Sequence, residues 1–203
     1  MLEVYLRPIY QSFLVDPIAR WFSNYSPMLI TYLACLIGVL VAPALMYGHP
    51  SLAIFFLLVS GFLDTLDGTV ARINNSVTEQ GIIFDIVSDR MVEAAVIVGL
   101  FAVDPSHRAW LSLAMMASCY VCMTSFLVVG IFSPNRGQGT MQYNPGIIER
   151  AEAFVFFLLM ICLPHHFSIL GWAFVGFVMY IAYSHLARSI QTISRRTTYG
   201  EPR

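Results

Sequence analysis

The sequence predicts an all-α integral membrane protein with six transmembrane helices and an N-terminal amphipathic helix at the membrane surface. Of its 203 residues, 58% are hydrophobic and only 11% are charged, whereas soluble domains carry about 25% charged residues. The hydrophobic residues also gather in stretches of about 20, which is the length that crosses a bilayer as a helix. We expect residues 1–203 to form one compact membrane domain.

Residues 1–25 form the predicted amphipathic helix. Glu3, Arg7, Asp16 and Arg20 interrupt the apolar residues of this segment, so it lacks the continuous apolar stretch of a secretory signal. A mixture of charged and apolar residues is typical of a helix that lies in the membrane interface.

Six apolar stretches follow, separated by residues that end helices. Ser26 and Pro27 are typical of the position before a helix and of its first residue, and Pro105 and Pro164 separate later stretches. The predicted spans are about residues 28–47, 51–73, 79–103, 109–132, 147–163 and 168–192.

The basic residues, all of which are arginines, predict the orientation. Six spans place both termini on one side of the membrane, and the loops of the opposite side hold only Arg108. Because basic residues stay on the cytoplasmic side, we expect both termini to be cytoplasmic. The arginines on the side of the termini are Arg7, Arg20, Arg72, Arg136, Arg150, Arg195, Arg196 and Arg203.

Four aspartates lie in the second and third predicted spans, where a charge is costly. One carboxylate inside a membrane segment costs about 2.5–3.5 kcal/mol, so four would cost on the order of 10–14 kcal/mol. Asp64 and Asp67 are three residues apart and Asp85 and Asp89 are four apart, so each pair lies on one helix face. The predicted topology brings both pairs to the cytoplasmic end of adjacent spans, facing one cavity.

A cation must balance these carboxylates, and a divalent metal is the first candidate. Oxygen ligands favour Mg²⁺ or Mn²⁺ over zinc, and four carboxylates could hold two ions about 3.5–4 Å apart, as in phosphoryl displacement. Arg72 and Arg90 could neutralise part of the charge, and the acidic path of an ion-coupled transporter is the competing interpretation. A transporter would carry acids toward both faces and often repeated halves, whereas these acids gather at one face and no repeat is visible.

Residues beside the aspartates indicate a phosphate-binding site. Gly68 and Gly81 leave room for a phosphate or a neighbouring backbone. Arg72 lies one turn from Gly68 and can pair with a diphosphate, and Thr78 in the connecting loop could donate a hydrogen bond to it. The net charge of −1 gives no basic field of the kind that indicates a nucleic-acid partner.

Together these residues resemble the signature of the CDP-alcohol phosphotransferase family. The six-span architecture and the N-terminal helix also resemble that family, so the resemblance covers essentially the whole chain. The start of the first span is similar to the family's Pro-Asn-x-x-Thr motif, with Met28 in place of Asn and with Thr31 retained. The matching signature positions are Asp64, Asp67, Gly68, Ala71, Arg72, Gly81, Asp85 and Asp89.

The resemblance implies a class I CDP-alcohol phosphatidyltransferase, which moves a phosphatidyl group from CDP-diacylglycerol to a hydroxyl acceptor and releases CMP. It implies that Asp64, Asp67 and Asp85 bind the metal pair, and that Asp89 completes the metal site and acts as the general base. It also implies a homodimer with its active site on the cytoplasmic side. The donor-binding residues that it implies are Asp64, Gly68, Arg72, Thr78 and Thr31.

The acceptor depends on less distinctive residues. Residues 146–152 resemble the corresponding part of phosphatidylinositol-phosphate synthases, in which arginines bind the acceptor's phosphate. Arg136, Arg150 and Arg195 are therefore candidate acceptor-binding residues, while the alternative is that interfacial arginines mark topology and touch lipid headgroups. Inositol phosphate is the preferred acceptor, and glycerol 3-phosphate (for a phosphatidylglycerophosphate synthase) or another small alcohol stays open.

Two further polar residues lie within the predicted spans. Glu93, one turn beyond Asp89, could extend the polar pocket or pair with Arg90, and we expect the pairing. His185 could face the cavity or make a local polar contact, and its role stays open.

Overall fold

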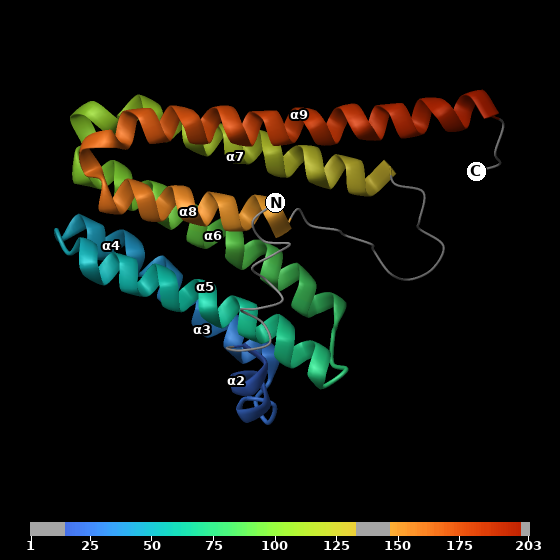
Figure 1. Ribbon diagram of the computed structural model, residues 1–203, viewed down its shortest axis with the longest axis horizontal. Helices are drawn as coiled ribbons and strands as arrows, with labels where there is room; N and C mark the ends of the chain where they lie inside the picture. The colour runs from blue at the N-terminus through green and yellow to red at the C-terminus, as the bar shows by residue number, and fades with distance from the viewer. Residues whose placement is uncertain (1–14, 133–146, 200–203) are drawn as a thin grey trace. The chain divides into compact units, whose positions relative to one another are not determined.

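The computed structural model describes residues 15–132 and 147–199, and these ranges are largely helical and contain no strand (Figure 1). The fold class is therefore all-α, as predicted. Two compact units are present: the first contains the chain up to Ala109 together with Phe157–Pro164, and the second contains the rest. The helices are α2 (Asp16–Trp21), α3 (Pro27–Val39), α4 (Val41–Met46), α5 (Pro50–Ile73), α6 (Glu79–Val103), α7 (Pro105–Phe132), α8 (Ile147–Cys162), η2 (Pro164–His166) and α9 (Phe167–Tyr199).

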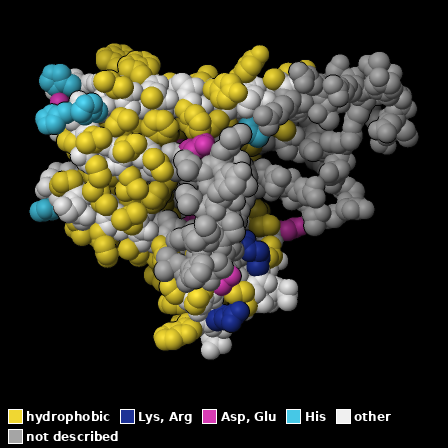
Figure 2. Space-filling view, in the orientation of Figure 1, with side chains coloured by type: hydrophobic (Ala, Val, Ile, Leu, Met, Phe, Trp, Pro, Cys, Tyr) yellow, Lys and Arg dark blue, Asp and Glu magenta, His cyan; other side chains and the backbone are white. Residues whose placement is uncertain are grey.

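Four helical stretches in the described ranges are long and apolar enough to cross a membrane: Pro27–Met46, Pro50–Ile73, Pro105–Ile131 and Pro164–Ala187. Helix α6 is also long but carries several charged residues, and the apolar part of α8 is shorter, at Glu152–Cys162. Hydrophobic side chains cover much of the described surface in Figure 2. These features indicate a multi-pass membrane protein, and the count of six spans stays a prediction.

The first predicted span is divided into two helices, α3 and α4, with a break at Leu40. The cause is Pro43, which has no N–H to donate to the Val39 carbonyl four residues earlier. The chain tightens there, and the Leu40 N–H donates to both Leu36 O at 3.4 Å and Ile37 O at 3.2 Å. Together α3 and α4 make up the stretch Pro27–Met46, which is long and apolar enough to cross a membrane and agrees with the predicted span at about 28–47; the break within it was not predicted.

Helix α7 begins at Pro105, four residues before the predicted span. Asp104 precedes it, and its Oδ1 accepts hydrogen bonds from the His107 N–H at 3.3 Å and from the Ser106 hydroxyl at 2.9 Å. Arg108, which the positive-inside argument placed in a loop, lies inside the helix and is only 8% exposed. Its guanidinium donates to Leu100 O at 3.0 Å and to Pro164 O at 3.3 Å, both within the first unit.

Small residues let the helices of the first unit pack closely (Figure 1). A Cβ built on Gly38 of α3 would lie 2.4 Å from Val92 Cγ2 on α6 and 2.6 Å from Ser60 Oγ on α5, and one on Gly99 of α6 would lie 2.9 Å from Ala42 Cα on α4. The Ser60 hydroxyl also donates to Ala34 O at 2.8 Å. Such small-residue contacts are typical of helices packed within a membrane.

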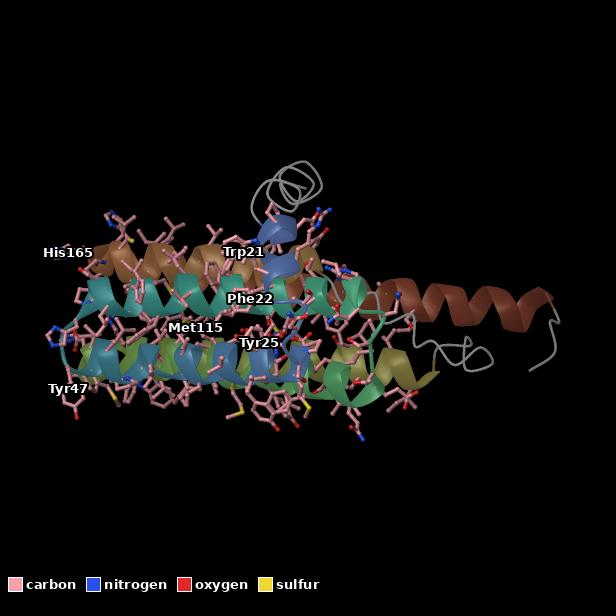
Figure 3. All side chains as sticks on the ribbon, turned by 90° about the horizontal axis from the view of Figure 1, so that it is seen from below. Trp21, Phe22, Tyr25, Tyr47, Met115 and His165 are labelled. Carbon is pink, nitrogen blue, oxygen red and sulfur yellow. The ribbon has the colours of Figure 1, made fainter. Side chains whose placement is uncertain are left out.

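Helix α2 is the described part of the predicted N-terminal helix, and residues 1–14 lie outside the described residues. One side of this segment is buried, because Val15 and Ala19 pack with Ile30, Leu66 and Val70 of α3 and α5. Trp21 at its end is 86% exposed (Figure 3). The interfacial position of this helix stays a prediction.

The second unit is built from α7, the first part of α8, and α9. Gly171 of α9 faces Leu111 of α7 so closely that a Cβ would lie 2.6 Å from Leu111 Cδ2. His185 stacks on Phe126, with ring centroids 4.2 Å apart.

Candidate active site

Three of the four aspartates come together between α5 and α6. One carboxylate oxygen each from Asp64, Asp67 and Asp85 lies within 4.8 Å of the other two. Asp64 and Asp67 are on adjacent turns of α5, and Asp85 is in the second turn of α6. The sequence-based expectation that these side chains share one site agrees with this geometry, and the whole group belongs to the first unit.

The turn between α5 and α6 sets the register of this group. Helix α5 ends in a Schellman motif: Asn75 has φ of 48°, the Ser76 N–H donates to Ala71 O at 2.9 Å, and the Asn75 N–H donates to Arg72 O at 3.2 Å. Helix α6 then begins after Thr78, whose Oγ1 accepts the Gly81 N–H at 3.1 Å. Thr78, predicted to bind the donor, therefore has a structural role as the N-cap of α6.

Asp67 is the most deeply buried of the three, with 6% of its surface exposed. Its Oδ2 has no hydrogen-bond partner among the described residues. Thr31 of α3 lies beside it, and the carboxylates of Asp64 and Asp85 repel its charge. A buried carboxylate with this environment is unfavourable unless a cation joins it, so the residues fit a divalent metal with oxygen ligands.

Asp89 is one turn beyond Asp85 on the same face of α6. It is half-buried and is not part of the group of three carboxylates. Glu93 follows after one further turn and forms an ion pair with Arg90, as expected from the sequence.

The surroundings of Gly68 differ from those of the packing glycines. Among the described residues, a Cβ at Gly68 would meet only Arg72 Nη1, at an ordinary contact distance of 3.7 Å. Arg72 is exposed, and its Nη2 donates to Thr69 Oγ1 at 3.1 Å. Protein packing therefore does not require glycine at position 68, and the space above it is open beside the carboxylates.

Sequence reasoning missed Thr69 and Ser88. Thr69 could have been found from its position one turn before Arg72, which is hydrogen-bonding distance on a helix. Ser88 is buried one turn after Asp85 and leaves no distinctive pattern in the sequence.

The candidate acceptor residues cannot be placed at the site. Arg136 lies outside the described residues. Arg150 and Arg195 lie in α8 and α9, but their side chains also lie outside the described part of the structure. Their acceptor role stays a prediction.

The apolar helices and the group of three carboxylates define a membrane protein with a candidate metal site. The family model for CDP-alcohol phosphatidyltransferases matches residues 24–192, and the chain belongs to this family. The matched range contains every residue of the carboxylate group, together with Gly68 and Arg72.

Several characterised proteins are similar to the chain. The CDP-diacylglycerol–inositol 3-phosphatidyltransferase of Candida albicans is 29% identical over 140 residues, which is 68% of this chain and 60% of that protein. The phosphatidylinositol phosphate synthase of Mycobacteroides abscessus is 28% identical over 95 residues, or 47% of this chain and 42% of the relative. The bifunctional IPC transferase and DIPP synthase of Aquifex aeolicus is 30% identical over 174 residues, or 84% of this chain and 39% of the relative. The chain thus matches less than two thirds of the length of each.

Proposed function

We propose that the protein synthesises a phospholipid by moving the phosphatidyl group of CDP-diacylglycerol to a hydroxyl acceptor, with release of CMP. The observation that carries this proposal is the group formed by Asp64, Asp67 and Asp85, whose oxygens lie within 4.8 Å of one another in a helix pair of a membrane protein. Family membership supports the same reaction class. A donor with acyl chains in the lipid and a cytidine in water suits a site near a membrane surface.

Asp64, Asp67 and Asp85 would hold the divalent cations, Mg²⁺ or Mn²⁺, with two ions as the expected number. Bound cations would neutralise the donor's diphosphate and stabilise the charge on departing CMP. The open space over Gly68 admits the diphosphate close to the backbone of α5. Arg72, held by Thr69 at 3.1 Å, presents its guanidinium next to that space and can bind a phosphate oxygen.

Asp89 would act as the base. It accepts the proton of the acceptor hydroxyl, and the acceptor oxygen forms a bond to the phosphorus that carries the diacylglycerol. The bond from that phosphorus to the CMP oxygen breaks, and CMP leaves with the electron pair. Aspartate is a weak base at neutral pH, so alignment of the acceptor beside the carboxylate group would supply much of the rate.

The acceptor is proposed to be an inositol, free or phosphorylated. This choice rests on the relatives from Candida albicans and Mycobacteroides abscessus, whose names specify an inositol acceptor and a phosphatidylinositol phosphate product. Arg136, Arg150 and Arg195 would bind the phosphate of a phosphorylated inositol. Glycerol 3-phosphate remains the alternative acceptor.

A direct assay tests the function. The purified protein is incubated with labelled CDP-diacylglycerol and Mg²⁺ or Mn²⁺, and separately with inositol, inositol phosphate, glycerol 3-phosphate and serine. We expect CMP release and a labelled lipid product with an inositol acceptor. Product with glycerol 3-phosphate alone would correct the acceptor, and no metal-dependent CMP release with any acceptor would contradict the enzyme assignment.

A further inference from the structure

Several serine and threonine hydroxyls in the described helices donate to a carbonyl three or four residues earlier on the same helix. Thr65 donates to Gly61 O at 3.0 Å and Thr69 donates to Thr65 O at 2.9 Å. Ser60 instead reaches a carbonyl on the neighbouring helix α3. The same local pattern is found at Thr31, Ser118, Thr124, Ser125 and Ser184.

Ser88 on α6 and Ser112 on α7 depart from this pattern. Both side-chain oxygens are buried and have no hydrogen-bond partner among the described residues. Only 4% of Ser88 and 5% of Ser112 is exposed. A buried hydroxyl without a partner is unfavourable, and in a native protein it points to a water, an ion or a ligand.

The contacts of the residues one turn before and one turn after Ser88 locate it along α6. Asp85, three residues earlier, contributes to the carboxylate group. Val92, four residues later, lies beside Gly38 of α3, and Gly38 is also close to Ser60 of α5. Ser60 is one turn before Asp64 on α5, so Ser88 lies along α6 between the turn of Asp85, in the carboxylate group, and the turn of Val92.

The Oδ2 of Asp67 is a second buried oxygen with no hydrogen-bond partner in the same helix cluster. A cation without bound water would interact with this carboxylate oxygen, but it would leave the Ser88 hydroxyl, one turn after Asp85 on α6, without a hydrogen-bond partner. Mg²⁺ and similar hard cations keep several of their waters when they bind to proteins, and each retained water needs acceptors for its hydrogens. The Ser88 side-chain oxygen is such an acceptor.

We infer that Ser88 is a positioning residue for the cation site, and that its hydroxyl oxygen accepts a hydrogen bond from a cation-bound water on the side away from the substrate. This inference rests on the proposed function, because it requires the carboxylate group to bind a divalent cation. Ser88 acts through the water and does not touch the substrate. The hydrogen bond fixes the position of the cation between α5 and α6.

Direct metal binding tests the inference without relying on turnover. Mn²⁺ affinity is measured by electron paramagnetic resonance on purified full-length protein, for wild type and for Ser88→Ala, Ser88→Thr and Ser112→Ala. We expect Ser88→Ala to weaken Mn²⁺ binding roughly tenfold, as is typical when an outer hydrogen bond to a metal site is lost. Ser88→Thr, which keeps the hydroxyl, should stay within about threefold of wild type.

Ser112→Ala is the matched control, since Ser112 is similarly buried and also has no hydrogen-bond partner in the part of the chain that the structure describes, but lies on α7 in the second unit. It should leave Mn²⁺ affinity unchanged. In the CMP-release assay, Ser88→Ala should raise the Mn²⁺ concentration needed for half-maximal rate, with a smaller change in rate at saturating Mn²⁺.

Two results would overturn the inference while leaving the proposed function in place. The first is wild-type Mn²⁺ affinity in Ser88→Ala, and the second is an equal loss in Ser88→Ala and Ser88→Thr, which would show that side-chain volume matters rather than the hydroxyl. Failure of wild type itself to bind Mn²⁺ would instead contradict the proposed function, and this inference with it.

Discussion

At the scale of single residues, the site combines an unfavourable charge with an open space. Asp67 is buried among core residues of α5 and near two other carboxylates, and one of its oxygens has no hydrogen-bond partner. Gly68, the next residue, has no neighbour among the described residues that a Cβ would displace. The buried carboxylate lowers stability and the space over Gly68 is left unfilled; under the proposed function, a bound cation and a diphosphate would make both features favourable.

The first prediction concerns Asp67→Asn. Without metal, this variant should be more stable than wild type, by about 1–3 kcal/mol, because a buried charge and its repulsion by two neighbours are removed. With Mn²⁺, wild type should gain stability and the variant should gain little. Thermal unfolding in detergent, with and without Mn²⁺, measures both effects, and a metal-free variant less stable than wild type would contradict this account of Asp67.

The second prediction compares three glycine-to-alanine variants. Gly68→Ala should fold as wild type does but raise the KM for CDP-diacylglycerol by about tenfold or more, because the new methyl occupies space needed by the donor. Gly38→Ala should instead destabilise the protein by about 1–3 kcal/mol through overpacking against Val92. Gly130→Ala, which has no atom of the described residues within 4 Å of its Cβ, is the control. Normal donor KM in Gly68→Ala would argue against a ligand in that space.

At the scale of helices, the residues at which each helix begins and ends determine which side chains face one another. The span predicted at about 79–103 coincides with α6, which the structure shows to be capped by Thr78 and to end before Asp104-Pro105. The sequence-based prediction missed the break at Leu40, since the effect of Pro43 is expressed at residues before it. It also misplaced the start of α7, because a buried Arg108 bonded to carbonyl oxygens looks like a loop arginine in the sequence.

The third prediction concerns the start of α7. Hydrogen bonds from His107 and Ser106 hold the pKa of the Asp104 carboxyl below its usual value. The ionised Asp104 carboxylate therefore stabilises the folded state. This contribution is fully present above about pH 4, the ordinary pKa of aspartate, and is lost as the pH falls through the lowered folded-state pKa.

Thermal unfolding of wild type and Asp104→Asn as a function of pH measures this effect. The stability difference between the two proteins should stay constant above about pH 4 and shrink as the pH falls below it. A difference that does not change with pH would show that the Asp104 carboxylate contributes nothing through its charge.

At the scale of the whole molecule, the site belongs to the first unit, whereas the candidate acceptor arginines Arg150 and Arg195 belong to the second. The aspartates could be predicted because fixed spacing on helices encodes a shared face, and membrane burial makes their charge conspicuous. The deep burial of Asp67 and the lack of a hydrogen-bond partner for the Ser88 hydroxyl among the described residues could not be predicted from the sequence. Both depend on how α3, α5 and α6 pack. The acceptor could not be derived either, since interfacial arginines serve topology and lipid contacts as readily as recognition.

The central claim is that the group of Asp64, Asp67 and Asp85 binds a divalent cation on which phosphatidyl transfer depends. The most direct test is a Mn²⁺ titration of CMP release by metal-stripped wild type, Asp64→Asn and the control Asp104→Asn, whose aspartate is exposed outside the group. We predict no release without metal, saturable recovery in wild type and Asp104→Asn, and a loss of at least about a hundredfold in Asp64→Asn. CMP release by metal-stripped wild type, or an unchanged titration in Asp64→Asn, would contradict the claim.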